Sequence, residues 1–163
     1  MKTLILGLGN PILGDDGVGI YIASALDGLF QDTEVYTASM IDLNMLDLFI
    51  EYDRVIVIDA LLDGSSPIGT LRKLPLGQAT LHLFSSHGVH FFELLQLGKD
   101  LRYDLPRIER IYGIGIGDGA VFGTELSPRL MEMIEDIIHE IIRDLRKCFS
   151  VSCKGFEDFR DCL

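Results

Sequence analysis

Carboxylates and an imidazole stand where this sequence leaves its most apolar stretches. Asp15 and Asp16 follow the first apolar run through a glycine-rich loop, and Asp59 ends a second run. His87 lies in a short polar loop before a segment with helical spacing. Because ligands of open α/β sheets bind beyond the carboxyl ends of the strands, these side chains are candidates for one site. Two carboxylates and an imidazole would form a partial ligand set for zinc, nickel or manganese.

The glycine-rich loop has the spacing of a phosphate-binding loop but the wrong charge. Gly9 and Gly14 have the G-x-x-x-x-G spacing of a P-loop. At the positions where that motif needs Lys and Ser or Thr, the sequence has Asp15 and Asp16. Adjacent carboxylates repel phosphate and attract a metal ion or a protonated group. The loop therefore predicts cation binding rather than nucleotide binding.

Each of these residues also has a purely structural interpretation. Asp15 has the position of an N-cap for a following helix, and Asp16 would then be a first-turn carboxylate favoured by the helix dipole. Asp59, at the end of an apolar strand, must be solvated, paired or coordinated. His87 has a competitor in His90, one helical turn later, and the two could form a metal pair. The residue pattern leaves both choices open.

Strands and helices alternate along the chain. Strand patterns are predicted at 3–8, 34–39, 54–60, 69–74 and 110–116. Helices are predicted at 16–26, 43–50, 87–97 and 128–147, with Asp42 and Ser127 placed to cap the second and the last. This order predicts an α/β fold with three layers, in which a mainly parallel or mixed twisted sheet of about five strands has helices on both faces.

Composition and charge limit the partners. The chain has 163 residues and a formal net charge of −11, which argues against nucleic acid and anionic membrane surfaces as partners. It has no apolar run near the roughly 20 residues of a membrane span and no secretory signal pattern, so we expect no membrane insertion and a cytoplasmic location. We expect one domain over 1–147 and a mobile tail over 148–163. The tail holds all three cysteines, without zinc-ligand spacing or a visible base, so no cysteine nucleophile is expected.

The segment Gly7-Leu-Gly-Asn-Pro-Ile-Leu-Gly-Asp-Asp-Gly-Val-Gly19 resembles the opening motif of the hydrogenase maturation proteases. These endopeptidases remove the C-terminal extension of the large subunit of nickel-iron hydrogenases. The resemblance continues through Val57-Ile-Asp-Ala60 and Ser86-His-Gly88, and it ends with Gly123 and the helix start Leu126-Ser-Pro128. It covers about residues 1–147.

This resemblance implies that Asp16, Asp59 and His87 bind metal and take part in catalysis. It thereby favours Asp16 over Asp15 and His87 over His90. It implies that the metal is nickel already inserted into the hydrogenase large-subunit precursor, with zinc or another divalent ion possible in its place. The sequence departs from the family at 39–42, where a Gly-Gly-Thr-like loop is usual, and at 115–119, where Pro and Glu are usual.

Two alternative functions use parts of the same pattern. A metal-sensing chaperone would bind the precursor without cutting it. The start Gly7-Leu-Gly-Asn-Pro11 also resembles bacterial-type peptidyl-tRNA hydrolases. Those enzymes continue into a Thr-Arg-His-Asn segment with the catalytic histidine, whereas this chain has no histidine before His82. The net charge is also unsuited to tRNA.

Overall fold

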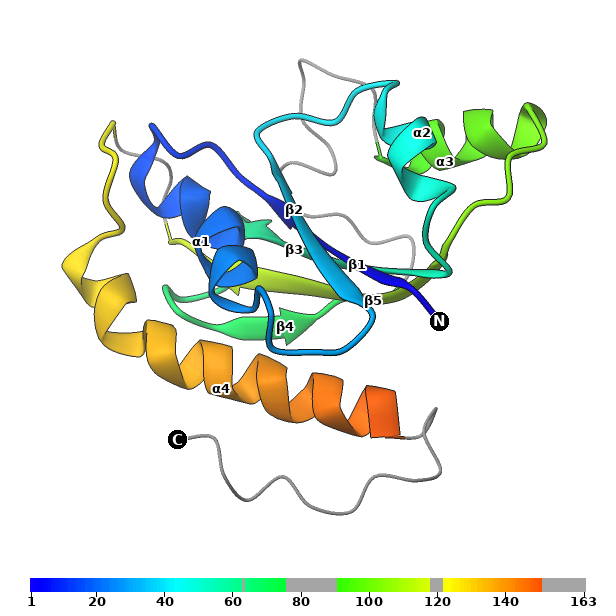
Figure 1. Ribbon diagram of the computed structural model, residues 1–163. Coiled ribbons are helices and arrows are strands. Elements are labelled where there is room, and N and C mark those ends of the chain that lie inside the picture. The colour runs from blue at the N-terminus through cyan, green and yellow to red at the C-terminus, as the bar shows by residue number, and fades with distance from the viewer. Residues whose placement is uncertain (63, 76–90, 118–121, 151–163) are drawn as a thin grey trace.

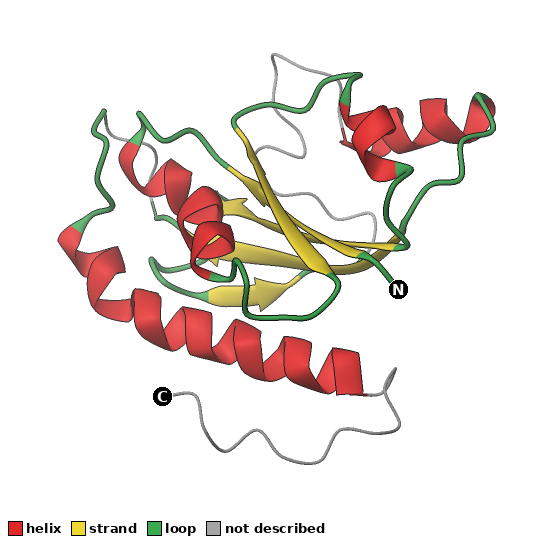
Figure 2. Ribbon diagram, in the orientation of Figure 1, coloured by secondary structure: helices red, strands yellow, loops and turns green. Residues whose placement is uncertain are grey.

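The computed structural model has the alternation of strands and helices that the sequence predicts (Figures 1 and 2). It describes residues 1–62, 64–75, 91–117 and 122–150. The strands are β1 (Thr3–Leu8), β2 (Thr33–Ala38), β3 (Arg54–Leu61), β4 (Leu71–Lys73) and β5 (Arg107–Gly115). The helices are the 3-10 turn η1 (Gly14–Gly17), α1 (Val18–Ala25), α2 (Met45–Phe49), α3 (Phe91–Asp100) and α4 (Pro128–Ser150).

The five strands form one mixed sheet in the order β2-β1-β3-β5-β4. The first four strands of this order run parallel, and β4 pairs antiparallel with β5 at one edge. The sheet has helices on both faces, since α1 and α4 pack on one face and α2 and α3 on the other (Figure 1). The predicted α/β class with a mainly parallel sheet and three layers is therefore confirmed.

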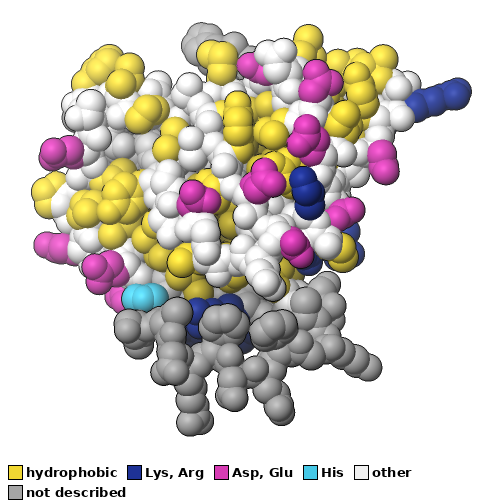
Figure 3. Space-filling view, in the orientation of Figure 1, with side chains coloured by type: hydrophobic (Ala, Val, Ile, Leu, Met, Phe, Trp, Pro, Cys, Tyr) yellow, Lys and Arg dark blue, Asp and Glu magenta, His cyan; other side chains and the backbone are white. Residues whose placement is uncertain are grey.

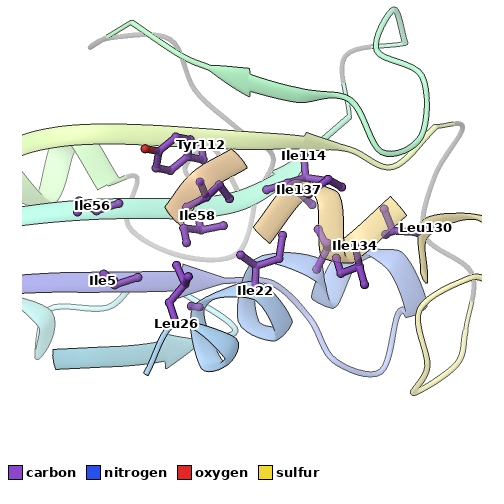
Figure 4. Packing of buried hydrophobic residues seen from close by; sticks show 14 of the residues in the cluster. Ile5, Ile22, Leu26, Ile56, Ile58, Tyr112, Ile114, Leu130, Ile134 and Ile137 are labelled. Atoms are coloured by element: carbon purple, nitrogen blue, oxygen red, sulfur yellow. The ribbon is translucent and has the colours of Figure 1, made fainter. Parts of the chain in front are cut away.

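Alternation along the strands divides the core between the two faces. Ile5, Ile56 and Ile58 point toward α1 and α4, where they meet the apolar side of each helix (Figure 4). Their neighbours Leu4 and Val57 belong to the cluster that α2 and α3 cover. Strands buried on both faces must be apolar at every position, which is why β1 and β3 appear in the sequence as continuous apolar runs.

Helix α4 packs through the stripe predicted from its 3.6-residue spacing. Five stripe positions are buried: Leu130, Ile134, Ile137, Ile141 and Leu145. Met133 was also predicted to belong to the stripe, but 38% of it is exposed, and it lies over Gly69 rather than in the core. The helix continues to Ser150, past the predicted domain boundary at residue 147. Residues 151–163 lie outside the described residues, so the tail stays a prediction.

A polar network also joins α4 to the sheet. The Tyr112 hydroxyl donates to Asp144 Oδ2 at 2.7 Å, and Lys73 Nζ lies 2.5 Å from Asp144 Oδ1. Burial alone would raise the pKa of Asp144, but the bonds from Lys73 and Tyr112 and the charges of Lys73 and Arg110 lower it below its usual value. The network therefore ties the antiparallel edge strand β4 to both β5 and α4. Among the described helices, none is long and apolar enough to cross a membrane.

Candidate functional site

The sheet order creates a switch point between β1 and β3. The chain leaves β1 toward β2 on one side and then returns to β3 on the other side of β1. Loops that depart in opposite directions leave a crevice at the carboxyl ends of such strands, where ligands of open α/β sheets bind. Asp16 follows β1 and Asp59 lies near the carboxyl end of β3, so both predicted carboxylates are carried by the two strands that flank the switch point.

Asp16 is held in a defined place by the turn that follows β1. Its residue is only 2% exposed, and its Oδ2 accepts the Asn10 N–H at 3.1 Å. The Asn10 carbonyl accepts the Leu13 N–H at 3.1 Å, and the Leu13 carbonyl accepts the Asp16 N–H at 3.3 Å. The loop thus folds back on the end of β1 and keeps the Asp16 carboxylate buried there.

The glycines of this loop allow backbone segments to approach closely. Gly9 has φ of 154°, and a Cβ there would collide with the Asp16 carbonyl. A Cβ on Gly19 would lie 2.5 Å from the Ile58 carbonyl oxygen and 3.0 Å from Asp59 Cα. Gly19 is one helical turn after Asp16, so its close approach brings the Asp16 segment against the end of β3. Gly9 and Gly19 therefore allow the close packing of the two segments that carry Asp16 and Asp59.

Asp59 is completely buried within β3. Its Oδ1 accepts the N–H of Ala60 at 2.8 Å. The sequence predicted that Asp59 ends its strand. The strand instead continues to Leu61, so Asp59 lies two residues before the strand end. Strand alternation puts its side chain on the face of Val57, which is the face covered by α2 and α3. A carboxylate in this position is shielded from bulk solvent and well suited to interact with a cation.

Asp15 was predicted to cap the helix that follows it, and this prediction is wrong. Neither η1 nor α1 has a side-chain cap. Instead the Asp15 carboxylate accepts the Ser127 N–H at 2.6 Å and the Ser127 Oγ–H at 2.7 Å, across 112 residues of sequence. Ser127 Oγ in turn accepts the Leu130 N–H at 3.3 Å at the start of α4, which confirms Ser127 as the predicted cap.

Sequence reasoning missed this long-range pair, which we call the Asp15–Ser127 clasp. A second contact supports it, because the Gly14 N–H donates to the Gly123 carbonyl at 2.7 Å. The free N–H groups at a helix start attract a carboxylate, and the Ser-Pro start of α4 was the one signal in the sequence that pointed to such a partner. The clasp holds the residue next to Asp16 and leaves Asp16 as the buried carboxylate of the pair.

The predicted histidine lies outside the described residues. His87 and its competitor His90 both fall in 76–90, so the choice between them stays a prediction. Within the described ranges, no three His, Cys, Asp or Glu side chains come together in a group that could hold a metal ion. Carboxylate oxygens such as those of Asp16 and Asp59 are donors that divalent ions accept in general, and a complete protein site needs a further ligand.

The environment of Cys148 does not activate its thiol. It lies in α4 rather than in the predicted tail, and its Sγ donates to Glu109 Oε1 at 3.1 Å. Burial, followed by the bond to Glu109, raises the pKa of the Cys148 thiol above its usual value. Since the thiolate is the nucleophilic form, this environment argues against a role for Cys148 in covalent catalysis, in agreement with the sequence prediction.

Comparisons with known proteins identify the family. A family model described as hydrogenase maturation protease matches residues 20–144, a range that includes Asp59 but begins after Asp16. The Hydrogenase 2 maturation protease of Escherichia coli is 23% identical over 90% of this chain and 92% of its own length. The hydrogenase expression/formation protein HupD of Thiocapsa roseopersicina is 26% identical over 96% of this chain and 73% of its own length.

Solved structures share the fold. The hydrogenase maturating endopeptidase HybD from E. coli superimposes with a TM-score of 0.68 at 22% identity, covering 91% of this chain and 94% of HybD. That similarity establishes the same α/β fold. The family model spans most of the chain, so the match extends well beyond a single motif. The chain therefore belongs to the hydrogenase maturation protease family and is an enzyme of that family.

Proposed function

We propose that this enzyme removes the C-terminal extension of a nickel-iron hydrogenase large-subunit precursor after nickel has been inserted. The observation that carries the proposal is the burial of Asp16 and Asp59 at the β1–β3 switch point of a maturation-protease fold. In this proposal the nickel belongs to the precursor and is part of the substrate. The two carboxylates recognise it, and the reaction depends on carboxylates rather than on a cysteine.

Burial gives the carboxylates a reason to prefer a metal-loaded precursor. The attraction between a carboxylate and a divalent cation rises as water is excluded, because the local dielectric constant falls. A precursor without nickel offers no such attraction, so it would bind weakly and stay uncut. Selecting the loaded precursor in this way prevents cleavage before the metal centre is complete.

His87 is the proposed third ligand. Its support is the Ser86-His-Gly88 motif, which lies within the range that the family model matches. Two carboxylate oxygens and one imidazole nitrogen suit nickel, and zinc or another divalent ion would be accepted in a test of binding.

The same carboxylates have a second use in the cleavage step. A divalent ion at the scissile bond supplies Lewis acidity toward a carbonyl or a water molecule. An ionised carboxylate at hydrogen-bond distance then accepts the proton of the attacking water, and Asp16 and Asp59 are the candidates for this role. The alternative within this proposal is that the metal only docks the precursor. We also propose that the enzyme acts in the cytoplasm, as the sequence predicts.

The test is cleavage of a purified, nickel-loaded large-subunit precursor, with the product mass measured by mass spectrometry. We expect one cut with the wild-type enzyme and no product with Asp16→Asn, Asp59→Asn or His87→Ala. His139→Ala is the matched control, because His139 is exposed on α4, and it should cut normally. Loss of activity only in His90→Ala would refute the choice of His87.

The chaperone alternative predicts a different result in the same experiment. A non-cleaving chaperone would form a complex with the loaded precursor that is visible by gel filtration, while the precursor mass stays unchanged. Binding without a change of mass under conditions where the nickel content has been verified would therefore overturn the protease proposal. Cleavage of a nickel-free precursor at the same rate would overturn the role of nickel as the recognition element.

A further inference from the structure

We propose that the outer edge of β2 binds the precursor's C-terminal segment as an added β-strand. This inference rests on the proposed function, because it names the surface that holds the peptide to be cut. Strand β2 is at one end of the sheet order and has β1 as its only strand neighbour among the described residues. Figure 1 shows β2 along the near edge of the sheet.

The register shows which backbone groups β2 presents outward. The Thr3 N–H donates to the Asp32 carbonyl and the Gly9 N–H donates to the Ala38 carbonyl. In a parallel pair with this register, the even-numbered residues of β2 bond to β1. The N–H and C=O groups of Val35 and Thr37 therefore point away from the sheet. Such groups are a template for an extended peptide, whose main chain supplies the matching donors and acceptors.

A groove beside this edge would accept the peptide's side chains. It has a volume of about 360 Å³ and lies between the end of β2, the loop after it and α2. Its lining includes Tyr36, Met40, Met45 and Leu48. Tyr36 and Met40 are 44% and 52% exposed, so they provide apolar surface beside the groove that a bound peptide can cover. Alternate residues of an added strand would point into this groove, because strand side chains alternate between faces.

The groove is continuous with the candidate active site. Ala38, which ends β2 and lines the groove, accepts the N–H of Gly9 at 3.2 Å. Gly9 precedes Asn10, whose N–H binds the Asp16 carboxylate. A peptide that runs along β2 toward its carboxyl end therefore arrives at the loop that carries Asp16. This continuity is the reason to identify the occupant as the segment around the cleavage site.

Charge adds a preference within that segment. The groove is lined by Asp42 and contains no Lys or Arg among its lining residues, in a chain of net charge −11. Figure 3 shows acidic side chains beside hydrophobic ones on the face that β2 presents to the viewer. The favoured peptide is therefore extended and carries both apolar and basic side chains. Basic residues near the cut would speed association more than they would strengthen the bound state.

The decisive test removes one outward N–H without disturbing the β1 ladder. Thr37→Pro deletes the N–H that points to solvent, a position where an edge strand tolerates proline. Thr37→Val is the matched control, because it changes the side chain and keeps the N–H. With nickel-loaded precursor we expect Thr37→Pro to raise KM about tenfold, as for the loss of one hydrogen bond, with kcat within about twofold of wild type. Equal KM values for the two variants would overturn the proposal.

Hydrogen exchange tests the same contact without relying on cleavage. In the wild-type enzyme mixed with the nickel-loaded precursor, the amide groups of Val35 and Thr37 should exchange at least about tenfold more slowly than in the free enzyme. Unchanged exchange in a complex that gel filtration shows to be formed would refute strand addition, and this readout decides the matter if Thr37→Pro lowers the melting temperature. If the precursor binds and protects the β2 amides of the enzyme but is never cut, the proposed function is refuted and the strand-addition inference still holds.

The groove has its own control pair. Met40→Lys places a positive charge on the apolar rim, and Leu101→Lys makes the same change at a residue of similar exposure beyond α3. We expect Met40→Lys to weaken precursor binding several-fold, because it opposes both the apolar and the basic preference, and Leu101→Lys to leave it unchanged. A result in which both variants bind like wild type would remove the groove from the proposal.

Discussion

The Asp15–Ser127 clasp gives the sharpest prediction about this fold. Asp15→Ala removes an acceptor for two short hydrogen bonds, of 2.6 and 2.7 Å, to the start of α4. A hydrogen bond to a charged group contributes about 1.5–3 kcal/mol. Because Asp15 is half-buried and water can replace part of the loss, we expect Asp15→Ala to lower the free energy of unfolding by about 2–3 kcal/mol. Urea unfolding followed by far-UV circular dichroism measures this value.

A double-mutant cycle separates the clasp from a local cap. Ser127→Ala removes the Oγ bond to Asp15 and the bond from Leu130, and should cost about 1–2 kcal/mol. The double variant should lose about 1 kcal/mol less free energy of unfolding than the summed losses of the two single variants, because that sum counts the shared Asp15–Ser127 bond twice. Strictly additive losses would refute the clasp. Asp27→Ala, at an exposed aspartate after α1, is the control and should change stability by no more than about 0.5 kcal/mol.

Three further predictions concern packing and pH. Tyr112→Phe should cost about 1.5–3 kcal/mol at neutral pH, as measured by urea unfolding, because the charged acceptor Asp144 loses a 2.7 Å bond. The pKa of Asp144 is lowered in the folded state, so its stabilisation is present above the unfolded pKa of about 3.9 and is lost as the pH falls through the lower folded value. Asp144→Asn should therefore destabilise the protein at pH 7 and flatten the loss of stability below about pH 4, and an unchanged acid dependence would contradict this account. Gly19→Ala should lower the free energy of unfolding by about 1–3 kcal/mol or more, because the new Cβ would meet backbone oxygens of β1 and β3. Gly123 has open space around it, so Gly123→Ala is the control and should have the melting temperature of the wild type.

The ends of the elements show where local patterns stop being sufficient. The sequence predicted the last strand at 110–116, but β5 begins at Arg107 and includes an irregularity of register opposite Val55 and Ile56. The charged residues of this first part resemble a loop when taken alone. They join the strand because the backbone of β3 is available beside them. Pairing between distant segments overrides local composition in this region.

The sequence by itself determined the fold class, the order of the elements and the presence of carboxylates near the carboxyl ends of β1 and β3. These features depend on periodicity and on glycine and proline positions, which are local properties of the chain. The tertiary structure decided the different roles of two adjacent carboxylates. Asp15 binds Ser127, a partner 112 residues away, while Asp16 is buried beside the end of β1. Nothing within a few residues of either aspartate distinguishes them, because the difference lies in the segments that the folded chain brings against each one.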